Sequence, residues 1–317
     1  MRIRAGRLRR TLLATGVAAA VVLPLSAAAR PEIPAPAPAS LGHVTASTLT
    51  DAYAANRANA REAATMAERY GAGDRAAALR AMASPDRRFL AFDGRGAGRT
   101  AEVFGDLAAA ESVAVLVPGS DTSLDSYGRL RSGALALRDE LGPRAAVVAW
   151  LGYETPGTVS PAVLTTGRAD QAAPALRSFV ADLRGVNAHA RVSLLCHSYG
   201  SVVCASAASG PRGLAVADIA FYGSPGTGVD KAADLNTPAR IWAGRGADDW
   251  IADVPHTSAD LFGTTVGFGT DPVSRGFGAR LFAAGEGGHS DYLKPGSASL
   301  DNLARIVRGD EPEVTHA

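Results

Sequence analysis

Residues 194 to 203 read Leu-Leu-Cys-His-Ser-Tyr-Gly-Ser-Val-Val. The apolar residues before Ser198 favour a buried strand, and those after it favour a helix that begins at once. A serine on such a tight turn has strained backbone angles, so the residues two before and two after it must be small. Gly200 meets this demand fully, and Cys196 stands where glycine is usual but is still small. The run predicts a nucleophilic Ser198, and the alternative is a buried serine that merely ends a strand.

The sequence around this run alternates apolar strands with helical segments. From Ser112 onward the pattern is typical of a parallel sheet covered by helices on both faces. We predict strands at Val113–Val117, Ala146–Trp150, Val192–Cys196, Ile219–Tyr222, Arg240–Ala243 and Ala279–Ala284. The clearest predicted helices are Tyr127–Leu141, Asp170–Val186, Tyr199–Ala208 and Leu300–Val307. The predicted fold class is α/β, with a mostly parallel central sheet.

A helical segment is predicted ahead of the sheet. Leu49 to Tyr70 contains neither Gly nor Pro, and Thr48 followed three residues later by Asp51 resembles a helix-start signal. A second helix is expected from about Asp74 to Met82. No residue set in this region suggests chemistry, so residues 46–86 are interpreted as a helical cap or packing arm.

Two β-rich runs follow the helical segment. Arg88–Asp93 and Thr100–Gly105 are joined by the glycine-rich turn Gly94–Gly98, which predicts a hairpin. A length of 317 residues allows one large core or two small ones. We assign residues 87–317 to a single catalytic domain.

The N-terminus has the three-part layout of a secretory signal peptide. Arginines precede the uncharged apolar run Thr11–Leu25, and small residues follow at 26–29. We predict a cleaved signal peptide at 1–29 and an extended Pro/Ala-rich spacer at 30–45. The expected location is secreted or in the cell envelope, with no stable membrane span after cleavage. The alternative is a signal anchor, because the uncharged stretch approaches the roughly 20 residues that span a bilayer.

The overall charge excludes a nucleic-acid partner. Lys and Arg number 32 against 31 Asp and Glu, which leaves a formal net charge of +1. The basic excess lies at the extreme N-terminus, so most of the chain lacks the positive field that would attract a polyanion.

A nucleophilic serine needs a base, and histidine has the suitable pKa. Of six histidines, His197 adjoins Ser198 in a strand, where neighbouring side chains point apart. His256 and His289 are the two best placed. In the chain order serine, acid, histidine, His289 fits, because it follows the last predicted strand in a loop of small residues. The remaining three lie near the termini or before the strand: His43, His189 and His316.

The acid is expected in the loop after the strand Arg240–Ala243. Asp249 is preferred because the apolar residues that follow it, Trp250 and Ile251, would anchor the loop while the carboxylate turns inward. Asp248 is the alternative, and Asp253 is third.

Two backbone N–H groups are expected to receive the oxyanion. The turn at Ser198 aims the N–H of Tyr199 into the space above the serine. The second donor should come from the loop after the first buried strand, where Ser120 and Gly119 are the candidates.

These motifs resemble a known group, the α/β-hydrolases of actinobacteria described as a domain of unknown function. The likeness extends from Phe89 to about Leu293. It includes Val117-Pro118-Gly119, Trp150-Leu151-Gly152-Tyr153, His197-Ser198-Tyr199-Gly200-Ser201, Gly223-Ser224-Pro225-Gly226, Phe268-Gly269-Thr270-Asp271-Pro272 and Gly288-His289-Ser290-Asp291-Tyr292. The resemblance implies the α/β-hydrolase fold and the triad, but no substrate. Within these motifs, Tyr153 is expected to pack at the rim and Asp271 to form a turn, rather than to line a pocket or a lid.

The two cysteines, Cys196 and Cys204, provide neither a disulfide framework nor a zinc-ligand cluster. The predicted helix doubles back along the strand, so the two side chains approach one another, and an exported chain meets an oxidising environment. A disulfide and a pair of buried free thiols both remain open.

The sequence therefore predicts an exported serine hydrolase that cleaves a carboxylic ester, or an amide, through an acyl-enzyme on Ser198. The expected partner is a small-molecule or lipid-like ester substrate, and no metal or organic cofactor is needed. Two alternatives are an acyltransferase with the same triad and a non-catalytic binding protein of the cell envelope.

Overall fold

The computed structural model describes residues 32–211, 213–261 and 264–316. The predicted signal peptide therefore lies outside the described residues. The chain divides into two units, and every element named below belongs to the larger one, Pro34–Ala317. None of the helices in the described ranges is long and apolar enough to cross a membrane.

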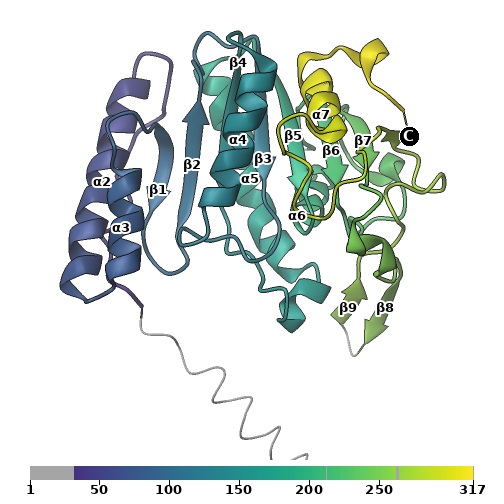
Figure 1. Ribbon diagram of the computed structural model, residues 1–317, viewed down its shortest axis with the longest axis horizontal. Helices are drawn as coiled ribbons and strands as arrows, with labels where there is room; N and C mark the ends of the chain where they lie inside the picture. The colour runs from purple at the N-terminus through teal and green to yellow at the C-terminus, as the bar shows by residue number, and fades with distance from the viewer. Residues whose placement is uncertain (1–31, 212, 262–263, 317) are drawn as a thin grey trace, which may run out of the picture. The chain divides into compact units, whose positions relative to one another are not determined.

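A mixed sheet of eight strands forms the centre of this unit (Figure 1), in the order β1-β2-β4-β3-β5-β6-β7-β10. The hairpin of β1 and β2 is antiparallel, as is the pair β2 and β4, whereas all strands from β4 to β10 in this order run parallel. The strands are β1 Phe89–Asp93, β2 Arg99–Phe104, β3 Ser112–Val117, β4 Ala145–Leu151, β5 Arg191–His197, β6 Asp218–Tyr222, β7 Arg240–Gly244 and β10 Arg280–Leu281. The prediction of a mostly parallel α/β sheet is confirmed.

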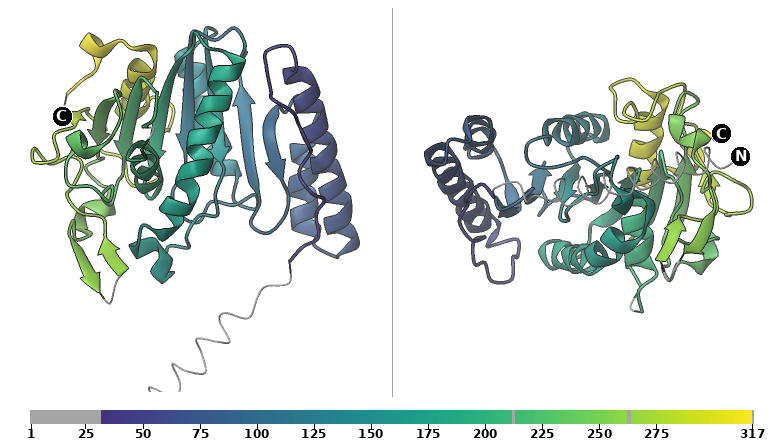
Figure 2. Two further views of the ribbon diagram at one scale, coloured as in Figure 1. Left: turned by 180° about the vertical axis from the view of Figure 1, so that it is seen from behind. Right: turned by 90° about the horizontal axis from the view of Figure 1, so that it is seen from below.

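Helices cover both faces of the sheet (Figures 1 and 2). On one face lie α4 (Gly128–Leu141) and α7 (Ala298–Arg308), and on the other lie α5 (Gly167–Val186) and α6 (Gly200–Ala208). Every residue of β3 and β4 is buried. These central strands read as continuous Val- and Ala-rich runs because both of their faces are covered.

The N-terminal helices pack at the outer edge of the sheet. The first, α2 (Leu49–Arg69), contacts both β1 and α3 (Gly73–Met82). Thr48 is the residue before α2, but its side chain makes no capping bond. Its hydroxyl instead accepts a hydrogen bond from the N–H of Thr45 at 2.8 Å. The helix begins where predicted. The Thr48 side chain does not cap it, because a local turn with Thr45 already uses the Thr48 hydroxyl.

Two features near the C-terminal half differ from the predictions. The last strand is shorter than the predicted Ala279–Ala284. The N–H of Ala283 binds the carbonyl of Thr315 at 2.8 Å instead of a neighbouring strand, so the chain leaves the sheet there. An antiparallel hairpin of β8 (Ser258–Leu261) and β9 (Thr264–Gly267) was not predicted. A bridge between Thr165 and Val266 ties it to the segment after β4, a contact between residues about a hundred positions apart.

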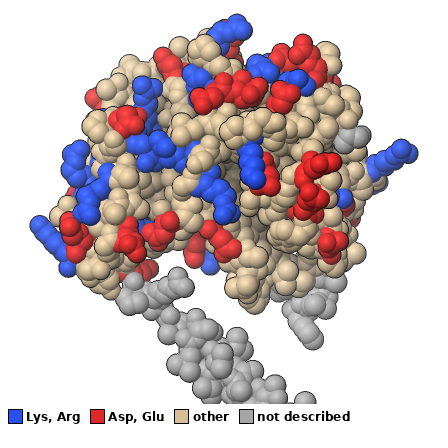
Figure 3. All heavy atoms as spheres, viewed as in Figure 1, with Lys and Arg blue, Asp and Glu red and all other residues tan. Residues whose placement is uncertain are grey.

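Charges of both signs are interspersed over the face shown in Figure 3. This distribution agrees with a formal net charge of +1. No single-sign field extends over this face, so electrostatic attraction of a polyanion to it is weak.

Candidate active site

The turn between β5 and α6 places Ser198 at the carboxyl edge of the parallel strands. Ser198 has a φ of 53°, and Asp121 is the only other non-glycine residue in the described ranges with a positive φ. A Cβ on Gly200 would lie 2.4 Å from the carbonyl oxygen of Val117. Glycine is therefore required at position 200, because β3 passes too close for a side chain.

The structure brings the three predicted residues of the triad together. Nε2 of His289 lies 3.0 Å from Oγ of Ser198. Nδ1 of His289 lies 2.9 Å and 3.1 Å from the two carboxylate oxygens of Asp249. These are hydrogen-bonding distances, so one imidazole connects a hydroxyl to a carboxylate.

Asp249 is buried, whereas the alternatives Asp248 and Asp253 are exposed. Oδ1 of Asp249 also accepts the N–H of Ile251 at 2.9 Å, so the loop curls around the carboxylate. Burial raises the pKa of Asp249, but hydrogen bonds from His289, Tyr292 and the backbone outweigh it and hold the pKa below its usual 3.8. The carboxylate stays ionised and stabilises positive charge on the imidazole.

Tyr292 supports Asp249, a role that the sequence analysis missed. Its O–H donates to Oδ2 of Asp249 at 2.5 Å and accepts the N–H of Gly246 at 3.0 Å. Burial and the neighbouring Asp249 raise the pKa of the phenol, so it remains a donor. The only signal in the sequence was its place three residues after His289 in a motif already noted.

His197 contacts the backbone and the ring of His289. Its Nε2 lies 2.7 Å from the backbone carbonyl oxygen of His289, and the two rings are 4.8 Å apart. Burial and, to a smaller extent, His289 lower the pKa of His197 to about 3. The ring is therefore neutral, and a proton on Nε2 is donated to the carbonyl. From the sequence, His197 was rejected as the base and no other role was predicted for it.

The loop after β3 lies directly against Ser198. A Cβ on Gly119 would lie 2.6 Å from Cβ of the serine. Within the described ranges, no acceptor binds the backbone N–H of Ser120 or of Tyr199. The side chain of Tyr199 contacts the start of α5, because its O–H donates to the carbonyl of Thr165 at 2.7 Å and accepts the N–H of Ala169 at 3.2 Å.

The loop after β4 holds the loop after β3 in position. Tyr153 is buried and donates its O–H to the carbonyl of Pro118 at 2.6 Å, in agreement with the predicted packing role. The N–H of Asp121 binds the carbonyl of Pro156 at 3.0 Å, and its carboxylate accepts the N–H of Thr158 at 3.2 Å. These bonds fix the backbone next to Ser120.

Asp271 forms the expected turn. Its carbonyl accepts the N–H of Ser274 at 3.0 Å, and Oδ1 accepts the N–H of Val273 at 3.1 Å. An ion pair with Arg245 at 2.7 Å adds a tie to the loop after β7.

Residues 93–259, more than half of the chain, match the family model described as alpha/beta hydrolase. The chain belongs to the alpha/beta hydrolase family. The matched region includes Ser198 and Asp249, and His289 lies beyond it. The resemblance identified from the motifs is thereby confirmed, and the protein is a hydrolase of this family.

The relatives of this hydrolase include uncharacterized mycobacterial proteins. One from Mycobacterium tuberculosis is 31% identical over 254 residues, which cover 69% of this chain and 38% of that protein. One from Mycobacterium bovis is 30% identical over 164 residues, which cover 47% of this chain and 60% of that protein. The matches thus cover less than two thirds of either relative.

Similar solved structures are more distant in sequence. The esterase LipW from Mycobacterium marinum is 16% identical with a TM-score of 0.43, over 78% of this chain and 89% of that chain. A serine hydrolase without a lid from Xanthomonas campestris is 17% identical with a TM-score of 0.44, over 74% of this chain and 98% of that chain.

A disulfide joins Cys196 and Cys204 in this hydrolase. Both residues are completely buried. Of the two possibilities left open by the sequence, the structure has the bridge, which links β5 to α6 on either side of the serine. In the described ranges no group of three or more His, Cys, Asp or Glu residues is arranged to hold a metal ion.

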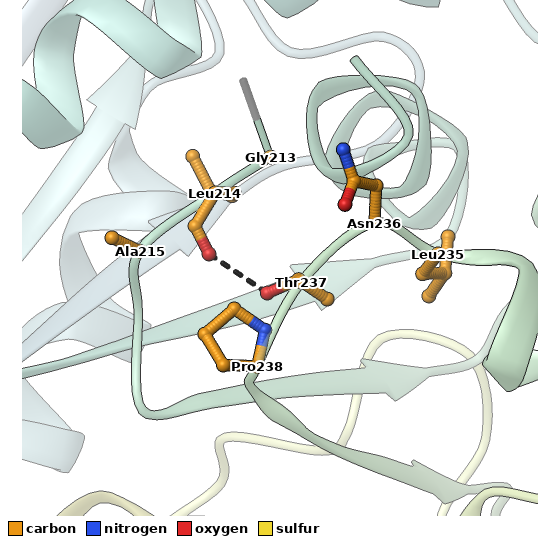
Figure 4. Close-up of a pocket in the computed structure, with 7 residues that line it drawn as sticks. All are labelled: Gly213, Leu214, Ala215, Leu235, Asn236, Thr237 and Pro238. Carbon is orange, nitrogen blue, oxygen red and sulfur yellow. Dashed lines mark hydrogen bonds between the residues drawn. The ribbon is translucent and has the colours of Figure 1, made fainter. Parts of the chain in front are cut away.

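A pocket of about 320 Å³ lies among the residues that precede β6 and β7 (Figure 4). Residues 213–215 and 235–238 line it, and the hydroxyl of Thr237 donates to the carbonyl of Leu214 at 2.7 Å. These residues precede β6 and β7, whereas Ser198 follows β5. The pocket therefore lies at the opposite edge of the parallel sheet from the triad.

Proposed function

We propose that the protein is an exported serine hydrolase that cleaves a carboxylic ester through an acyl-enzyme on Ser198. The observation that carries this proposal is the continuous hydrogen-bond chain from Ser198 through His289 to Asp249. A serine hydroxyl is a weak nucleophile at neutral pH, and an adjacent base that is oriented by a carboxylate activates it.

Acylation begins when Oγ of Ser198 attacks the carbonyl carbon of the ester and its proton passes to Nε2 of His289. The backbone N–H groups of Tyr199 and of Ser120 receive the negative charge on the carbonyl oxygen, with Gly119 as the alternative to Ser120. The bond from the carbonyl carbon to the alcohol oxygen then breaks, and the alcohol leaves with the proton from His289. Asp249 stabilises the imidazolium throughout.

Deacylation repeats the sequence with water as the nucleophile. His289 takes one proton from water while the hydroxyl attacks the acyl carbon. The carboxylic acid departs when Oγ of Ser198 recovers that proton.

A fluorophosphonate probe tests the assignment, since it labels an activated serine. We expect labelling of the wild type and none of Ser198→Ala, with loss of ester hydrolysis by about 10⁶-fold in kcat. Asp249→Asn should lower kcat by about 10⁴-fold, because an amide N–H in place of the carboxylate holds the imidazole in the wrong tautomer. Asp248→Asn is the matched control, and its activity should equal that of the wild type.

Two outcomes would contradict the proposal. Labelling that survives Ser198→Ala would point to a different nucleophile. A folded wild type that neither reacts with the probe nor hydrolyses any ester would favour a non-catalytic binding protein with this fold.

Export is a separate part of the proposal. It is supported by the basic, apolar and small-residue layout of residues 1–29. The buried disulfide adds support, because disulfides persist in oxidising compartments outside the cytosol. N-terminal sequencing of protein from the culture medium and from the cell envelope tests it. A chain found only in the cytosol with its first 29 residues intact would overturn export.

A further inference from the structure

Trp250 is exposed although it lies beside the triad. Its side chain is 52% exposed, and its ring centroid is 4.7 Å from that of His289. Among side chains of the described part, the other large apolar residues that are exposed are Tyr70, Leu135, Val159 and Leu164. None of these four has a ring contact with a residue of the triad. Trp250 thus places apolar surface in water next to the group that moves the proton.

The contacts of Asp249 fix the position of this tryptophan. Asp249 is the residue before the short helix Trp250–Asp253, and its carboxylate accepts the N–H of Ile251. Ile251 is buried and anchors the segment from inside. The indole is therefore held against the imidazole by the same loop that presents the acid.

The chemistry of acylation determines which part of a substrate meets this indole. His289 must deliver its proton to the leaving oxygen, so that oxygen lies within hydrogen-bonding reach of Nε2. The carbonyl oxygen instead faces the N–H groups of Tyr199 and Ser120. The carbon atoms attached to the leaving oxygen are thus the ones closest to the imidazole and to Trp250.

Charges in the loop that carries the indole argue against an anionic leaving group. Asp248 and Asp253 are exposed and flank Trp250 in the loop. Two carboxylates at this position repel a negatively charged alcohol. The aromatic surface itself favours apolar groups, because covering it removes apolar area from water.

We propose that Trp250 forms a leaving-group subsite and that the preferred substrates are esters of a bulky, uncharged, apolar alcohol. This inference rests on the proposed function, since it requires His289 to protonate the leaving group. It names a specificity determinant that the triad alone does not supply.

Two series of esters test the inference. In the first, butyrate esters of methanol, butanol, benzyl alcohol and choline vary the leaving group at constant acyl chain. In the second, methyl esters from acetate to octanoate vary the acyl chain at constant leaving group. Each series is measured as kcat/KM on the full chain for wild type, Trp250→Ala, Trp250→Phe and Leu135→Ala.

We expect the wild type to prefer benzyl over methyl butyrate, and Trp250→Ala to lower that preference by about tenfold. Trp250→Phe should keep most of it, because an aromatic face remains. Preferences within the acyl series should not change. Leu135→Ala removes a similarly exposed apolar side chain from α4 and should leave both series as in the wild type.

Three results would overturn the inference while leaving the proposed function intact. One is an equal loss of kcat/KM for every ester in Trp250→Ala, which would mean that the indole only positions His289. The second is a change in the kcat/KM preferences of the acyl series, with those of the alcohol series unchanged. The third is a wild-type preference for the choline ester, which would mean a cation-binding site. Absence of both phosphonate labelling and hydrolysis of every ester would instead overturn the proposed function, and the inference with it.

Discussion

Two residues that do not react determine the position of His289. His197 donates to its backbone carbonyl, and Tyr292 donates to the carboxylate that orients its ring. Hydrogen bonds at both the backbone and the acid restrict the imidazole to the geometry that reaches Ser198. Such supporting contacts account for much of the precision of a reactive site.

The buried imidazole of His197 predicts how folding stability depends on pH. Its pKa is about 3 in the folded chain, against an ordinary value of 6.5. Above pH 6.5 the His197 ring is neutral in both the folded and the unfolded chain, and the full stability is present. As the pH falls from 6.5 toward 3, the unfolded chain binds a proton that the folded chain does not, so stability declines by up to about 1.4 kcal/mol per pH unit.

The measurement compares wild type with His197→Gln in urea unfolding at pH 7 and pH 5. Glutamine does not titrate and keeps a donor for the carbonyl of His289. From pH 7 to pH 5 we expect the unfolding free energy of the wild type to fall by about 2 kcal/mol more than that of the variant. The exposed His189→Gln is the control and should follow the wild type. Identical losses in wild type and His197→Gln would show that His197 titrates normally when folded.

At the level of elements, the turn between β5 and α6 carries Ser198, and two features stabilise it. Gly200 lets α6 begin against the end of β3, and the disulfide from Cys196 to Cys204 ties the strand to the helix. Cys196 stands two residues before the serine, where glycine is usual. At this position the turn is therefore stabilised by a covalent bond, whereas the family pattern has a residue without a side chain.

Removing this bridge should lower stability by an amount set by the short loop that it closes. The cysteines are 8 residues apart, and the chain-entropy relation for such a loop predicts a loss of about 2.5 kcal/mol in Cys196→Ala/Cys204→Ala. Urea unfolding with and without reductant measures the difference. Reduced wild type should approach the double variant, and the double variant should not respond to reductant. Equal stability of oxidised wild type and double variant would contradict the prediction.

Across the whole molecule, a buried ion pair connects the N-terminal helices to the sheet. Arg87 lies between α3 and β1, and its guanidinium makes a bidentate contact with Glu102 of β2. The O–H of Tyr127, just before α4, also donates to Glu102 at 2.9 Å. Nη1 of Arg87 also donates to the carbonyl of Ala81 in α3 at 3.3 Å, so this ion pair links the helical arm, the sheet and a covering helix.

Breaking this pair should be far more costly than breaking an exposed one. Arg87→Ala leaves the carboxylate of Glu102 buried without its main partner, and we expect a loss of about 3–5 kcal/mol in unfolding free energy. The double variant Arg87→Leu/Glu102→Leu should lose less, because it removes the buried carboxylate together with its main partner. Arg144→Ala removes the exposed pair with Glu111 and should cost less than about 1 kcal/mol. Similar losses in Arg87→Ala and Arg144→Ala would refute this account.

Local patterns predicted most of the elements and pointed to Ser198, His289 and a short list of acids for the site. Apolar runs and helical periodicity depend on neighbouring residues, so nearly every strand of the large sheet was located within a residue or two. The β8–β9 hairpin was missed because its strands are only four residues long and it is tied to Thr165 across a long stretch of chain. The end of β10 was misplaced because Thr315 competes for its backbone N–H.

The sequence by itself determined the strand–turn–helix at Ser198, the alternation that builds a parallel sheet, and the chain order of serine, acid and histidine. Only the tertiary structure decided that Asp249 rather than Asp248 faces His289, that the cysteines are joined, and that His197 and Tyr292 hold the site. The reason is physical. A turn depends on residues within a few positions of one another, whereas the triad requires Ser198 to meet a histidine 91 residues away. That distance is closed only when the packed sheet brings the carboxyl ends of its strands to one edge.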